Sequence, residues 1–159
     1  MIAQGDGWAL GWCPPVLFTL VTRVPTDAEF ARLLQAVLAD IDGWSSTEQR
    51  SVLHHLPVAS QLTARQRQLI SAELSKREDQ LRRICCGYAL CTDSALTRGL
   101  LRVINWLAPP PYPTYNAATV LQGLRALVAT DKRVDPEDLE ARYRALFVNP
   151  LRALEPDQG

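Results

Sequence analysis

The strongest constraint on the fold is a repeated order of segments, in which short apolar runs are followed by helix-start signals. Signals of the form Thr-x-x-Glu/Gln occur at Thr26–Glu29, Thr63–Gln66 and Thr119–Gln122. In such a capping box the Thr side chain accepts from the backbone and the Glu or Gln side chain reaches back. Because strand-like runs alternate with these helices, we expect an α/β domain with a mostly parallel sheet.

The segments that read as strands are short, apolar and bounded by Pro, Gly or polar clusters. They are 8–12, 16–22, 51–56, 85–91 and 114–117. Helical patterns cover 27–41, a long mostly polar stretch from 64 to 84, 95 to about 107, 120–128 and 137–148. We therefore expect a mostly parallel or mixed five-stranded sheet with helices packed on it. A shift in composition at Thr130 divides the α/β domain (1–129) from a C-terminal helical extension and tail (130–159).

Composition excludes several classes of protein. The 159 residues are 47% hydrophobic, which suits one globular domain. Lys plus Arg (17) equals Asp plus Glu (17), so no overall field attracts nucleic acid. No apolar run approaches the roughly 18 residues of a membrane span, and the first residues lack a basic signal region. We expect a cytoplasmic protein that does not bind nucleic acid or insert stably into membranes.

Neither a metal nor another cofactor is expected. The four cysteines, Cys13, Cys85, Cys86 and Cys91, form no C-x-x-C pair, and His54 and His55 do not stand at zinc-like spacing from them. The chain has no glycine-rich phosphate loop of the G-x-x-x-x-G-K type. We read the cysteines as reduced residues of the core.

An unusually apolar helix over 95–107 is the best candidate for an interaction surface, because its large side chains spread around most of its circumference. The candidate contact residues are Leu100, Val103, Trp106, Leu107 and Tyr112, rimmed by Arg98 and Arg102. They would dock another protein or a second copy of this chain. Alternatively the helix at 137–148 folds back over them, or they make peripheral contact with a membrane surface or a lipid chain.

A second candidate site lies at the carboxyl ends of the strands, where ligands collect in open α/β sheets. His54 and His55 lie on opposite faces near the end of one strand, and Cys91 ends another. One histidine could enter a crevice, which would suit a carrier of small molecules or lipids. A cysteine-dependent enzyme is a further alternative. The plainer interpretation is one core histidine and one near a loop.

The run Ser94–Leu101 that leads into Asn105–Pro113 resembles the bacterial STAS-like proteins, relatives of the sulfate transporter and anti-sigma factor antagonist domain. The resemblance covers roughly Trp8 to Ala129. It implies a regulatory module without catalysis that docks on another protein, and from the apolar helix we expect a homo-oligomer or a complex with another protein. Some members are switched by phosphorylation near the start of the helix after the third strand, where this chain offers Ser60 and Thr63. Here Pro57-Val58-Ala59-Ser60 replaces the family's order of Asp, apolar residue and Ser.

Overall fold

A computed structural model of the 159-residue chain describes residues 1–44, 48–57, 63–99 and 110–148. In these residues one mixed sheet has six strands in the order β1-β2-β3-β4-β5-β6. The strands are β1 (Ala3–Gly5), β2 (Trp8–Cys13), β3 (Val16–Val21), β4 (Arg50–Leu56), β5 (Cys85–Thr92) and β6 (Thr114–Ala117). β1, β2 and β3 pair antiparallel, and β3 to β6 pair parallel.

The expected α/β class and mixed sheet are confirmed, but the expected number of five strands is wrong. The additional strand is β1, which has only three residues and no large apolar side chain. Its pairing with β2 follows a tight turn in which Gly7 adopts a φ of 79°, a conformation that favours glycine. The turn, rather than the composition of the strand, positions this edge.

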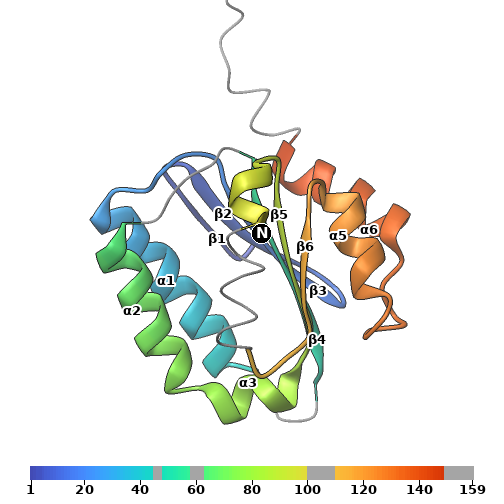
Figure 1. The fold of residues 1–159 in the computed structure, drawn as a ribbon, viewed down its shortest axis with the longest axis horizontal. Coiled ribbons are helices and arrows are strands. Elements are labelled where there is room, and N and C mark those ends of the chain that lie inside the picture. The colour runs from blue at the N-terminus through green and yellow to red at the C-terminus, as the bar shows by residue number, and fades with distance from the viewer. Residues whose placement is uncertain (45–47, 58–62, 100–109, 149–159) are drawn as a thin grey trace, which may run out of the picture.

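Helices cover both faces of the sheet (Figure 1). α1 (Asp27–Asp42), α2 (Ala64–Ser75) and α3 (Glu78–Ile84) lie on one face. α5 (Val120–Leu127), α6 (Pro136–Tyr143) and a π-helical turn η1 (Arg144–Val148) lie on the other. A further helical stretch covers 95–99. No helix among the described residues is long and apolar enough to cross a bilayer.

The single long helix expected over 64–84 is instead two helices. The chain leaves helical geometry at Arg77, where φ is −113° and ψ is 13°. The Arg77 guanidinium donates to both carboxylate oxygens of Asp42, at 2.7 and 2.8 Å, and to Glu73. This contact joins the break between α2 and α3 to the end of α1, so the long segment bends around the sheet.

The three helix-start signals all cap helices, but only one forms a complete capping box. Thr26, Thr63 and Thr119 each accept from the backbone amide three residues later. Only at Thr63 does the fourth residue of the signal, Gln66, also accept from the backbone amide of the capping residue. Glu29 instead accepts from the Trp8 indole at 2.8 Å, which ties α1 to β2.

The sheet separates two apolar cores. Under α5 and α6 the core includes Phe18, Leu53, Leu124, Tyr143 and Phe147. Under α1 and α3 it includes Leu10, Leu17, Leu33, Val52 and Leu81. β3 is buried along its whole length, as expected for a strand covered on both faces. Side chains of α6 and η1 pack against Phe18, so residues beyond 130 share a core with the strands.

Candidate functional site: an apolar cavity between the helices and the sheet

The candidate site is a cavity of about 180 Å³ on the face of the sheet that α1 and α2 cover. Its described lining comes from α1, α2, α3 and the three strands β3 to β5, together with Pro25, Trp44 and Tyr112. The helices contribute Phe30, Leu33, Leu34, Val37, Ile41, Ile70, Leu74 and Leu81. The lining is almost entirely apolar, and no charged side chain is among its described members.

The period of two along parallel strands explains how the sheet forms one wall, because alternate residues point to the same face. β3 contributes Leu17, Thr19 and Val21, and β4 contributes Val52, His54 and Leu56. The register places Thr19 beside His54 and His54 beside Leu90 of β5. A row of three neighbouring side chains therefore crosses the middle of the wall.

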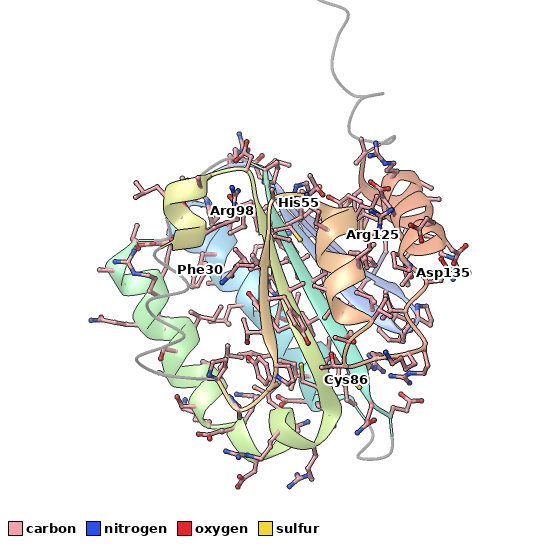
Figure 2. All side chains as sticks on the ribbon, turned by 45° about the vertical axis from the view of Figure 1, so that its right-hand side comes forward. Phe30, His55, Cys86, Arg98, Arg125 and Asp135 are labelled. Carbon is pink, nitrogen blue, oxygen red and sulfur yellow. The ribbon has the colours of Figure 1, made fainter. Side chains whose placement is uncertain are left out.

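Helix spacing forms the opposite wall. In α1 the lining residues recur at three- and four-residue intervals, as in Phe30, Leu33 and Val37. Figure 2 shows Phe30 on the α1 side of the sheet and His55 on the other side. Ile70 and Leu74 of α2 continue this wall. The apolar faces of α1 and α2 thus meet above the sheet without filling the space beneath them.

Trp44 bounds the cavity beyond the end of α1. Its indole nitrogen donates to the Asp40 carboxylate at 2.7 Å, and the Arg50 guanidinium stacks on its ring at 4.7 Å from the centroid. The same guanidinium also lies over the Trp12 ring, 4.4 Å from its centroid. Because polar and cation–π contacts fix Trp44, this part of the cavity wall is held in place.

His54 is the ionisable group at the centre of the sheet wall. Burial lowers its pKa from 6.5 to about 4, so the imidazole is neutral at pH 7. Its ring packs against Tyr88 with centroids 5.2 Å apart, and Tyr88 packs against Tyr112 at 6.1 Å. Burial also raises the pKa of Tyr112 to about 12. The cavity therefore presents neutral aromatic and polar groups at physiological pH.

The predicted crevice residues do not share one space. His55 points to the opposite face, where its Nδ1 lies 2.6 Å from the Tyr143 hydroxyl of α6. Cys91 is fully buried on that same face, and a Cβ built on Gly123 of α5 would meet its sulfur at 2.4 Å. Of His54, His55 and Cys91, only His54 lines the cavity.

The environments of the thiols do not favour a cysteine nucleophile. Burial raises the pKa of Cys85 and of Cys91 to about 12, and it also raises the pKa of Cys13 and Cys86. A reactive cysteine needs a lowered pKa, because the thiolate is the nucleophile. In the described part of the chain, no group of three or more His, Cys, Asp or Glu residues is arranged to hold a metal ion.

Most residues of the predicted interaction surface lie outside the described part of the chain, namely Leu100, Arg102, Val103, Trp106 and Leu107. Within it, Leu96 is 81% exposed, and Arg98 donates to the Thr92 carbonyl. Tyr112 instead packs inward and lines the cavity. α6 packs on the opposite core, so it does not cover Leu96 or Tyr112.

The two predicted phosphorylation candidates differ in what the structure describes. Ser60 lies outside the described residues. Thr63 is the capping residue of α2, and its hydroxyl accepts from the Gln66 amide at 3.2 Å. A phosphate on Thr63 would have to replace this hydrogen bond. Nothing in the structure distinguishes Thr63 from the other two capping threonines as a target for modification.

Sequence reasoning did not identify Thr19, Tyr88 or Phe30 as residues of a site. The alternation of Leu17, Thr19 and Val21 places Thr19 on an otherwise apolar row. A threonine in such a row was the available signal for a polar group on this face. The cavity itself depends on how far α1 and α2 stand from the sheet, which no residue pattern specifies.

The fold is similar to that of a known crystal structure. That structure is of an uncharacterized protein of the DUF3478 family from Shewanella loihica PV-4, described as having a SpoIIAA-like fold. The TM-score is 0.55 and the identity is 15%, and the match covers 80% of this chain and 98% of that chain. No family model matches the sequence, and no curated protein matches it.

At this identity the likeness shows the fold alone. The chain has a SpoIIAA-like fold, which is the STAS-like fold that the sequence resemblance implied. The class defined by fold and site together is therefore an α/β domain of SpoIIAA-like architecture with an apolar cavity beside its central parallel strands.

Proposed function

We propose that this protein is a binding protein without catalytic activity that holds a small apolar molecule in the cavity between α1, α2 and the sheet. The observation that carries the proposal is the cavity itself, about 180 Å³ of space with an apolar lining. Protein interiors are close-packed, and an empty cavity costs stability in proportion to its volume. A ligand that fills the space recovers the lost contacts.

The volume sets the size of the ligand. An apolar cavity of about 150 Å³ stays dry and binds benzene or xenon. A space of about 180 Å³ therefore suits one aromatic ring with a small substituent, or a short alkyl chain. A whole lipid or a nucleotide is too large for this space. Of the carriers of small molecules or lipids considered from the sequence, we therefore propose a carrier of small apolar molecules.

A role without catalysis is supported by the chemistry of the described side chains. The raised pKa values keep the four thiols protonated at pH 7. His54 has no hydrogen-bonded nucleophile among the described residues, and the partner of His55 is the Tyr143 phenol, whose pKa burial raises. Nucleophilic catalysis needs a nucleophile and a base within hydrogen-bond reach.

Thermal unfolding in the presence of toluene tests the proposal. We expect the wild-type melting temperature to rise by roughly 3–6 °C when toluene is at about ten times its Kd, because a ligand of the folded state stabilises it by mass action. Val37→Phe places extra carbon atoms in the cavity from α1 and is expected to abolish the shift. Circular dichroism measures both melts.

Val128→Phe is the matched control, since Val128 is partly buried against the core on the opposite face of the sheet. Its toluene shift is expected to equal that of the wild type. If Val37→Phe does not fold, Leu74→Phe fills the same cavity from α2. A wild-type protein whose melting temperature does not respond to toluene would contradict the proposal.

A second candidate function, the docking module expected from sequence, is favoured by the 81% exposure of Leu96. We propose a second copy of this chain as the occupant of that surface. Size-exclusion chromatography over rising protein concentration tests this. We expect a dimer that Leu96→Ser weakens at unchanged melting temperature, and a wild-type monomer at all concentrations would exclude self-association.

A further inference from the structure

We infer that the ligand of the cavity is a neutral molecule with one aromatic ring or a short alkyl chain and one hydroxyl group, which hydrogen-bonds to His54. This inference rests on the proposed function, because it specifies the chemistry of the molecule that the cavity holds. Two polar side chains on the sheet wall, His54 and Thr19, carry it.

Neither ring nitrogen of His54 has a hydrogen-bond partner among the described residues. Among the described residues, two side-chain polar atoms are fully buried and lack a hydrogen-bond partner, namely Thr19 Oγ1 and Arg50 Nε. His54 is not one of these residues: it is only partly buried, and its side chain lines the cavity. A neutral imidazole has one donor and one acceptor nitrogen. Because buried polar groups are normally satisfied, a ligand hydroxyl suits this position.

Thr19 supplies the second polar group. It is 1% exposed, its hydroxyl has no partner in the described structure, and it pairs with His54 across β3 and β4. The unpartnered Thr19 hydroxyl and the His54 ring thus belong to neighbouring residues on one wall of an otherwise apolar space. A hydroxyl can both donate and accept, so one ligand oxygen can serve both groups after rotation of the Thr19 side chain.

The lining also sets the charge and shape of the rest of the ligand. Its described members include no Lys, Arg, Asp or Glu, so a carboxylate or ammonium group would lose its hydration without a counter-charge. Tyr88 lies beside His54, and Tyr112 lies beside Tyr88, which offers a flat ring two aromatic neighbours. Edge-to-face and offset contacts between rings are favourable. Phenol is therefore a suitable probe.

Isothermal titration with phenol and with toluene tests the inference, since the two probes have nearly the same shape and differ in a hydroxyl against a methyl group. We expect wild type to bind phenol at least ten-fold more tightly than toluene. We expect His54→Phe still to bind toluene but to lose the preference for phenol. In Thr19→Val the preference for phenol falls several-fold. His55→Phe is the matched control and retains the wild-type preference, because His55 faces α6.

The outcomes separate this inference from the proposed function. If neither probe binds, the cavity is not a ligand site and both fail. If toluene binds as well as phenol, or the preference survives in His54→Phe, the cavity binds ligands but the assigned hydroxyl contact is wrong. If His54→Phe does not fold, NMR chemical shifts of the His54 ring in the wild-type protein test the contact instead. We expect phenol to shift these resonances more than toluene does, and equal shifts would overturn the inference.

Discussion

Shielding of the partly buried His54 ring lowers its pKa to about 4, which predicts a specific dependence of stability on pH. In the unfolded chain its pKa returns to about 6.5, and the unfolded state binds the proton first as pH falls. The free energy of unfolding therefore decreases between pH 6.5 and 4, by up to about 1.4 kcal/mol per pH unit from this residue. Above pH 7 His54 does not make the free energy of unfolding depend on pH.

Urea denaturation at pH 7 and pH 5 measures this effect, with His54→Phe for comparison. Burial also lowers the pKa of His55. His55 and the carboxylates are present in both proteins, so their contributions cancel in the comparison. The difference between the two proteins isolates His54. We expect the variant to lose less stability than wild type on acidification. Equal losses would show that His54 is not buried in the way described.

Among the elements, α5 lies close against the sheet. A Cβ on Gly123 would lie 2.4 Å from the Cys91 sulfur and 3.2 Å from Leu53 Cδ1. Gly123→Ala forces α5 away from β4 and β5, and overpacking of this kind typically costs about 1–3 kcal/mol. We expect a loss of unfolding free energy in that range by chemical denaturation.

Gly99→Ala is the control for this prediction, because it makes the same substitution in a helical stretch where a new Cβ meets no atom within 4 Å. We expect its unfolding free energy to equal or exceed that of wild type, since alanine favours helix by about 1 kcal/mol over glycine. If Gly123→Ala were as stable as Gly99→Ala, α5 would not be seated as closely as described.

The elements also show what residue patterns can predict. The five longer strands and the starts of α1, α2 and α5 follow from short, mostly apolar runs and capping threonines, because these signals are local. The break at Arg77 was not predictable in the same way, since it depends on Asp42 from another helix. The role of Glu29 was likewise missed, because its partner Trp8 lies on a strand 21 residues away.

For the candidate site, the sequence placed His54 and His55 on opposite faces of one strand near its carboxyl end, and this is the arrangement observed. It did not reveal which of the two histidines would line a cavity. That depends on the packing distance of whole layers: α5 and α6 fill the space over one face, whereas α1 and α2 leave a cavity over the other. Residue patterns encode which side chains turn inward, but not how completely they fill the interior.

Across the whole molecule, the two faces of the sheet are packed differently. The face under α5 and α6 packs Phe18 against Tyr143 and Phe147, and His55 bonds to Tyr143. The opposite face carries the cavity, which His54 and Thr19 line, and the Thr19 hydroxyl has no hydrogen-bond partner among the described residues. One half of the domain is therefore filled by packed side chains, and the other half carries the proposed binding site.

Native mass spectrometry of gently purified protein, compared with its denatured mass, shows whether the folded chain carries a small bound molecule. We predict one copy of the 17.7 kDa chain or a whole-number multiple of it, with a small non-covalent adduct that disappears on denaturation. A protein with no small adduct that also fails to take up toluene or phenol would contradict the account, whatever its oligomeric state.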